Sequence, residues 1–154
     1  MRKENGVLIG VTNDDLKLLK SNPKEFWEGV TKIGVGAFEY CSNLTSITIP
    51  DSVTEIRWNA FYGCSSLTSI TIPNSVTKIG KYAFEDCSSL TSITIPDSVT
   101  EIGDFSFSGC SNLREIIIPE DVEVGENVFK DCPNLKITRV KVKTEENGEN
   151  EERE

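Results

Sequence analysis

Hydrophobic and polar residues alternate in a short segment that recurs along the chain. Its seven residues, Leu-Thr-Ser-Ile-Thr-Ile-Pro, occupy 44–50, 67–73 and 90–96, and a diverged copy, Leu-Arg-Glu-Ile-Ile-Ile-Pro, occupies 113–119. In the first copy Ile47 and Ile49 fall on one face of an extended chain and Thr48 on the other, because successive side chains of a strand point to opposite faces. Pro50 offers no backbone N–H to a further ladder and ends the strand. The pattern predicts four short strands, each with one buried face.

These strands belong to a unit of 23 residues that repeats without interruption. Four full units occupy 30–52, 53–75, 76–98 and 99–121, and a fifth, one residue shorter, occupies 122–143. A unit this short cannot bury its own apolar face, whereas stacked units share backbone hydrogen bonds and bury their faces on one another. Self-similarity at this period therefore predicts a solenoid.

The remainder of each unit predicts a turn, a second short extended piece and about one helical turn. In the segment Asn-Ala-Phe-Tyr-Gly-Cys, Ala60, Phe61 and Cys64 are spaced at i, i+1 and i+4, which suits a helical turn. Large apolar residues that recur at the repeat spacing are predicted to form three buried rows. These rows are Leu44, Leu67, Leu90 and Leu113; Ile47, Ile70, Ile93 and Ile116; and Phe38, Phe61, Phe84, Phe107 and Phe129.

The spacing resembles the leucine-rich repeat pattern Leu-x-x-Leu-x-Leu-x-x-Asn. Leu44, Ile47 and Ile49 occupy its apolar positions, and Ser52 stands in place of the asparagine. The fuller pattern, Ser-Val-Thr-x-Ile-Gly-x-x-Ala-Phe-x-x-Cys-x-x-Leu-x-x-Ile-x-Ile-Pro, is similar to that of the BspA-like, or treponemal-type, leucine-rich repeats. The resemblance covers residues 30–143.

This resemblance implies a right-handed, curved leucine-rich-repeat solenoid with a parallel β-sheet on its concave side and short helical turns on the other side. Many members of the family are surface proteins of bacteria and protists that bind host or partner proteins, and none of the repeat positions is catalytic. The chain departs from the pattern at Arg57, where three units have glycine, and at Glu115 and Ile117 in the fourth strand. These departures predict a surface that differs from coil to coil.

The residues before the repeats predict two short helices. Thr12 followed by Asp15 forms a capping-box pattern with aspartate in the usual Glu/Gln place. Asn22 is a favoured N-cap for a second helix, which would lay Phe26 and Trp27 over the core of the first coil. Terminal units of solenoids need such a cover.

The residues at the other end predict a charged edge and an acidic tail. Arg139, Lys141 and Lys143 would charge the open edge of the last strand. Residues 144–154 hold six glutamates against Arg153 and cannot form a core. A solubilising role and an interaction role are both open for this tail. The chain is thus predicted to comprise a helical N-terminal cap (1–29), five leucine-rich repeats (30–143) and a disordered acidic tail (144–154).

The charge of the chain restricts the class of partner. The formal net charge is −9 and the sequence pI is about 4.6, which argues against nucleic acid or an anionic membrane as the main partner. No apolar run is long enough for membrane insertion. The N-terminal patch Gly-Val-Leu-Ile-Gly-Val is too short for a signal-peptide core. The sequence as written is therefore expected to be intracellular, or at the cell surface or secreted if an upstream export signal was removed.

The residues that most often carry chemistry do not form a site in this sequence. The chain has no histidine to act as a general base near neutral pH. Its five cysteines are 23, 23, 23 and 22 residues apart, which is neither a disulfide framework nor a zinc pattern, so five buried free thiols are expected. The alternation Lys32, Glu55, Lys78, Glu101 places opposite charges on neighbouring coils and serves stacking. We therefore expect no enzyme activity, no cofactor and no metal.

These observations predict a non-enzymatic protein–protein interaction module that is monomeric unless it belongs to an assembly. The alternative is a structural or assembly element of a larger complex without a discrete ligand site. An outward array of serine and threonine on the strands could also bind an ordered lattice such as ice or a glycan.

Aromatic residues outside the buried rows are the candidate partner-binding residues. The two columns before the Ala-Phe pair change a great deal between units, whereas the strand-facing Ser/Thr columns hardly change across three units. Exposed aromatic side chains dominate interface energies. A cluster that only shields the neighbouring coil is the alternative interpretation. The candidate residues are Trp58, Tyr62, Tyr82 and Phe105.

Overall fold

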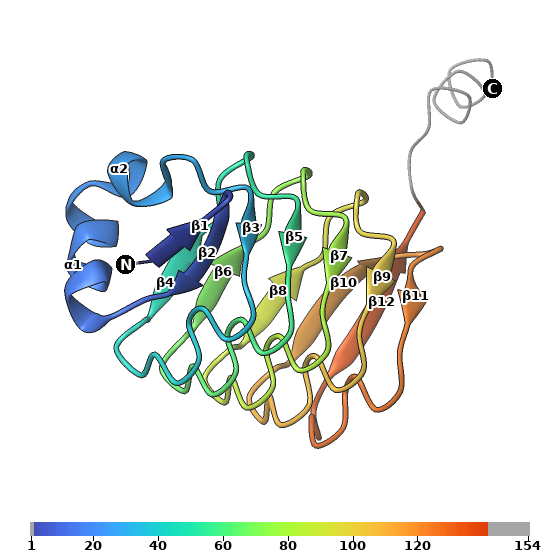
Figure 1. Ribbon diagram of the computed structural model, residues 1–154. Coiled ribbons are helices and arrows are strands. Elements are labelled where there is room, and N and C mark those ends of the chain that lie inside the picture. The colour runs from blue at the N-terminus through green and yellow to red at the C-terminus, as the bar shows by residue number, and fades with distance from the viewer. Residues whose placement is uncertain (1, 142–154) are drawn as a thin grey trace, which may run out of the picture.

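The computed structural model describes residues 2–141, which form a solenoid of stacked coils with two helices at its N-terminal end (Figure 1). The solenoid predicted from the repeat is confirmed. Strands lie on two sides of each coil and face each other across the core, with turns joining them at both ends. Lys143 and the predicted acidic tail at 144–154 lie outside the described residues.

One side of the solenoid is a seven-stranded sheet built mainly from two-residue strands. Each of these strands follows the turn after Pro-Asp-Ser or its equivalent, as the second extended piece predicted from the sequence. Adjacent strands of this sheet pair in parallel, except that β1 is antiparallel to β2. In spatial order the strands are β1 (Arg2–Glu4), β2 (Val7–Gly10), β3 (Lys32–Ile33), β5 (Glu55–Ile56), β7 (Lys78–Ile79), β9 (Glu101–Ile102) and β11 (Glu123–Val124).

The other side carries the strands predicted from the recurring seven-residue segment. They are β4 (Ser46–Thr48), β6 (Ser69–Thr71), β8 (Ser92–Thr94), β10 (Glu115–Pro119) and a fifth, β12 (Lys136–Val140). β4 pairs with β6, and β10 lies between β8 and β12, all in parallel. In each pairing equivalent residues meet, as Ile47 meets Ile70. The serines and threonines on the outer face are exposed, whereas the isoleucines between them are buried.

The segment predicted as a helical turn is a run of consecutive hydrogen-bonded turns. The N–H groups of Ala60, Tyr62 and Cys64 donate to the carbonyls three residues earlier. Asn59 and Gly63 take left-handed backbone conformations, with φ of 57° and 69°. Because Asn59 and Gly63 both have positive φ, these turns do not continue as a regular helix.

The three predicted apolar rows form the core. Every leucine and isoleucine of the rows is buried, and so are the phenylalanines at 38, 61, 84 and 107. The rings stack along the solenoid, with centroids 4.8 Å apart between Phe38 and Phe61 and 5.2 Å apart between Phe61 and Phe84. Phe129 in the last coil is only partly buried, because no further ring lies beyond it among the described residues. The register inferred from the 23-residue period is correct.

Threonine hydroxyls link successive coils in addition to the backbone. Thr54 donates both its N–H and its hydroxyl to the carbonyl of Thr31, at 2.8 and 3.3 Å. Thr77 bonds Thr54 in the same way, and Thr100 bonds Thr77. A serine stands where the family pattern has asparagine, and in one coil it forms a hydrogen bond with the backbone. There the Ser98 hydroxyl donates to the carbonyl of Val76 at 2.7 Å.

The N-terminal segment contains the two predicted helices and a hairpin that was not predicted from the sequence. α1 (Asn13–Ser21) starts at Thr12 with the predicted capping box to Asp15, and α2 (Pro23–Trp27) has Asn22 as its N-cap. Phe26 and Trp27 are buried against Phe38, with ring centroids 6.2 and 6.4 Å from it.

The hairpin extends the seven-stranded sheet by two strands. Asn5 and Gly6, both with positive φ, connect β1 to β2. β2 then pairs with β3, and its Leu8 lies opposite Ile33 in the buried row of that sheet. The segment before the repeats therefore adds strands to one side of the solenoid, and the helices cover the remainder of the first coil (Figure 1).

A buried hydroxyl in the fourth coil provides a test of core packing. Ser106 is fully buried, its Oγ has no hydrogen-bond partner, and the equivalent residues of the three earlier coils are alanines. Ser106→Ala removes an unsatisfied polar atom and should raise the free energy of unfolding by about 1–2 kcal/mol in urea titrations. The matched control Ala83→Ser should lower it. Destabilisation by Ser106→Ala would contradict the assigned packing.

Candidate functional site

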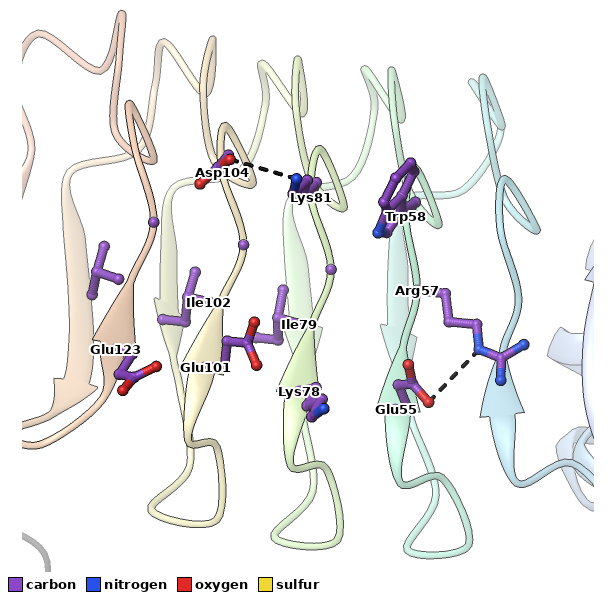
Figure 2. Close-up of a pocket in the computed structure, with 14 residues that line it drawn as sticks. Glu55, Arg57, Trp58, Lys78, Ile79, Lys81, Glu101, Ile102, Asp104 and Glu123 are labelled. Carbon is purple, nitrogen blue, oxygen red and sulfur yellow. Dashed lines mark ion pairs between the residues drawn. The ribbon is translucent and has the colours of Figure 1, made fainter.

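A shallow groove crosses the outer face of the seven-stranded sheet from β5 to β11. Its volume is about 300 Å³. Figure 2 shows two rows of side chains along it. One row is Glu55, Lys78, Glu101 and Glu123, and the other is Trp58, Lys81 and Asp104.

The groove exists because glycines separate the two rows. A Cβ atom on Gly80 would lie 2.8 Å from the carbonyl carbon of Arg57, and one on Gly103 would lie 2.5 Å from the backbone nitrogen of Lys81. The coils approach too closely here for a side chain, so the backbone forms the floor. Arg57 is the departure at this column, and its side chain bounds the groove at the β5 end (Figure 2).

Charged residues in the first row follow the alternation predicted from the sequence. Lys32 lies opposite Glu55, Glu55 opposite Lys78, and Lys78 opposite Glu101. The Lys32 Nζ is 3.6 Å from a Glu55 carboxylate oxygen, and the Arg57 Nε is 3.7 Å from the same oxygen. In the second row Lys81 Nζ lies 3.8 Å from Asp104. Such partly exposed pairs contribute about 0–1 kcal/mol each, so they organise the surface more than they stabilise the fold.

Trp58 is the most exposed of the four candidate residues. Its side chain is 54% exposed and stands at the rim of the groove. The Lys81 Nζ lies 5.5 Å from the centre of the indole ring, which is a cation–π distance. Trp58, Lys81 and Asp104 therefore form a connected row across three coils (Figure 2).

The other three candidates are half-buried and form two separate ring pairs. Tyr82 and Phe105 stack with centroids 5.5 Å apart, and both have left-handed backbones with φ of 60° and 57°. Tyr62 meets the edge of Tyr40, with centroids 5.3 Å apart, and Tyr40 is 66% exposed. Burial, with the neighbouring Tyr40 and Glu85, raises the pKa of Tyr62.

The structure thus brings Tyr82 into contact with Phe105, whereas Trp58 contacts Lys81 and Tyr62 contacts Tyr40. The predicted candidates do not form one continuous aromatic cluster. The groove itself was not predicted from the sequence, although the glycine column that creates it is visible there.

The opposite sheet also carries a hollow on its outer face. Its volume is about 570 Å³, and it is lined by hydroxyl residues such as Thr71 and Thr94 together with Ile117 and Val140. Ile117 is a departure noted in the sequence, since threonine occupies that position in the three preceding strands. The outward hydroxyl array is therefore interrupted by an apolar side chain in β10, and Thr138 of β12 lies opposite Ile117.

The cysteines line up inside the solenoid as free thiols. Cys64, Cys87 and Cys110 are buried, and Cys41 and Cys132 are partly buried. The Cys64 and Cys87 thiols donate to the carbonyls of Phe38 and Phe61, at 3.0 and 3.2 Å. Burial raises the pKa of Cys64 to about 12 and also raises the pKa of Cys87 and Cys110.

Residues 2–141 hold neither a cluster of metal ligands nor a membrane-spanning helix. No group of three or more cysteine, aspartate or glutamate side chains within this range is placed to hold a metal ion. Neither of its helices has the length and apolar character needed to cross a membrane.

Comparison with known proteins identifies the repeat. The family model for the BspA type leucine-rich repeat region, with six copies, matches residues 23–148. No curated protein matches the chain.

Three solved structures of bacterial leucine-rich repeat proteins are similar to this chain. A protein of T. pallidum is 36% identical, with a TM-score of 0.69 over 72% of this chain and 52% of that one. A protein of Bacteroides ovatus is 42% identical, with a TM-score of 0.67 over 72% and 29%. A leucine-rich cell surface protein of Faecalibacterium prausnitzii is 30% identical, with a TM-score of 0.70 over 96% and 35%. The chain therefore spans about half or less of the length of these relatives.

The buried thiols predict a loss of stability at alkaline pH. The folded state holds the Cys64 proton more tightly than an unfolded chain with a thiol pKa of 9.0 does. This contribution is fully present below pH 9 and is lost as the pH rises toward about 12, so the free energy of unfolding should fall across that range. Urea unfolding at pH 8, 9 and 10 measures it. Cys64→Ala should show a smaller fall, and an equal fall in both proteins would refute the assignment.

Proposed function

This chain belongs to the family of BspA-type leucine-rich repeats, and we propose that it is a non-enzymatic module for protein–protein binding. Repeats of this family generally mediate protein interaction. We place the binding surface on the side face that carries Trp58, Tyr82 and Phe105, with Tyr62 at its margin.

The observation that carries this assignment is the exposed indole on a rigid coil. Trp58 is 54% exposed, yet its carbonyl accepts from the N–H of Gly36 at 3.0 Å and the next residue, Asn59, donates to Lys81. Its backbone is thus fixed by both neighbouring coils. A large side chain on a backbone that is already ordered loses only its own rotamer freedom on binding, which favours affinity.

Variation between coils supports the same face. The column of Trp58 holds Val35, Lys81, Asp104 and Glu126 in the other coils, so stacking does not dictate the residue there. The next column holds Tyr82 and Phe105, although its left-handed backbone favours the glycine or asparagine found in the other coils. Two aromatic residues at positions that disfavour them indicate a role other than local folding.

The non-enzymatic part of the proposal rests on the chemistry of the groove. The chain has no histidine. Among the carboxylates that line the groove, Glu55 and Asp104 have cationic partners within 4 Å. Ion-paired carboxylates on an exposed surface suit binding better than proton transfer.

An assembly role is the second candidate function. β12 is the last described strand and lies at the edge of its sheet, so one of its two sides has no partner strand among residues 2–141. Its residue Ile137 is 44% exposed. The relatives extend well beyond the length of this chain. Stacking of further coils on this edge would use the chain as part of a longer solenoid.

Substitutions copied from other coils test the binding face without disturbing the fold. The variant combines Trp58→Val, Tyr82→Asn and Phe105→Asn, because valine and asparagine occupy these columns at Val35, Asn59 and Asn127. Its melting should match that of the parent. Affinity for a captured protein partner should fall about 30-fold, as expected when about 2 kcal/mol of aromatic contact is lost.

The opposite sheet provides the comparison. A matched variant carries lysine at Thr48, Thr71 and Thr94, which are exposed on β4, β6 and β8. If this variant abolishes capture and the aromatic variant does not, the binding site lies on the other sheet and the proposed face is wrong.

A further inference from the structure

The groove has an unbalanced negative charge at its C-terminal end. Four carboxylates line it, Glu55, Glu101, Asp104 and Glu123, against the three cationic side chains of Arg57, Lys78 and Lys81, which leaves a surplus of one negative charge. The alternation that pairs opposite charges from β3 to β9 breaks at the last step, because Glu101 lies directly opposite Glu123. Figure 2 shows these two carboxylates on neighbouring strands, at the end of the groove away from Trp58.

This pair of like charges differs from the other coils, in which opposite charges lie on neighbouring strands. A lysine at position 123 would continue the sequence Lys32, Glu55, Lys78, Glu101, and like charges directly opposite on paired strands destabilise a sheet. Both glutamates are exposed. Their placement is explained if an external cation lies between them in the bound state.

We propose that this groove binds an extended segment of a protein partner and that an arginine side chain of that segment lies between Glu101 and Glu123. Neighbouring strands are about 4.8 Å apart, so a planar guanidinium with donors on two edges can reach one carboxylate on each strand. A lysine ammonium is a point charge and bridges the two less well. The proposal rests on the proposed function, because it names the chemistry of the partner for the face that carries Trp58.

The second anchor of the segment is Trp58. It lies three coils from Glu123, which corresponds to roughly 14 Å at the spacing of paired strands. An extended chain covers about 13 Å in four residues. A partner segment with an aromatic residue and an arginine four positions apart therefore fits the groove from one end to the other. The glycine floor lets its backbone approach closely.

A short peptide tests the recognition without the natural partner. The probe is a fluorescein-labelled peptide of serine and glycine with one tyrosine and one arginine four positions apart. Its control replaces arginine by citrulline, which keeps the shape and loses the charge. Fluorescence anisotropy should show binding of the arginine peptide that weakens with salt, and at least about 10-fold weaker binding of the citrulline peptide.

Charge reversal at position 123 separates site binding from bulk attraction to an acidic protein. Glu123→Lys should weaken arginine-peptide binding about 10-fold and should raise the melting temperature, because it completes the alternation. Glu39→Lys makes the same change in net charge at an exposed position outside the groove, in a column where the last coil has Lys130. It should leave peptide affinity unchanged within about 2-fold.

The outcomes distinguish this proposal from the broader function. Equal weakening by Glu123→Lys and Glu39→Lys, or equal binding of the two peptides, would overturn the arginine site. If the arginine peptide does not bind but the aromatic variant still loses its protein partner, the arginine site is wrong and the binding face stands. If the aromatic variant keeps its partner while the peptide result holds, the groove binds cationic segments and the proposed aromatic face is wrong.

Discussion

Backbone hydrogen bonding between equivalent residues of successive coils is the constraint on which this structure depends. On the side of the two-residue strands, donors of a later coil reach carbonyls of the earlier one, as Thr54 reaches Thr31 and Thr77 reaches Thr54. At the turns the direction reverses, since Phe38 donates to Ala60 and Phe61 to Ala83. Each coil is therefore held from both sides and acts as the template for the next one. This requirement explains why the sequence repeats at a fixed interval and why few of the inward positions vary.

The same constraint explains where function can reside. Columns that stack must stay alike, whereas outward columns next to the turns are free to differ. The groove arises in one of these free regions because glycines bring the coils together and leave the backbone bare between two rows of charged and aromatic side chains. Trp58 at one end and the facing Glu101 and Glu123 at the other give the groove two chemically different ends. A repetitive scaffold thereby carries a surface that does not repeat.

The sequence predicted the solenoid, its period and the buried rows, because stacking leaves its mark on every unit. It predicted less where the structure depends on single positions. The hairpin was not predicted, although Asn5-Gly6 is a strong signal for a two-residue turn, because the residues before it, Arg-Lys-Glu, show no apolar alternation. The segment predicted as a short helical turn forms consecutive hydrogen-bonded turns and not a regular helix, because Asn59 and its equivalents take positive φ, which spacing alone does not reveal. Variability between coils indicated the candidate aromatics, but their pairing depends on side-chain direction, which the sequence does not encode locally. The separation of Tyr82 and Phe105 from Trp58 was therefore not predicted.

Removal of one complete coil tests the central claim most directly. If every interface between coils uses the same hydrogen-bond pattern, deletion of residues 76–98 joins two equivalent positions and leaves a shorter solenoid. Thermal unfolding followed by circular dichroism should then show one cooperative transition at a lower temperature than in the full chain, with the strand signal per residue retained. Loss of the cooperative transition after this 23-residue deletion would contradict the account, because it would mean that the coils are not interchangeable templates.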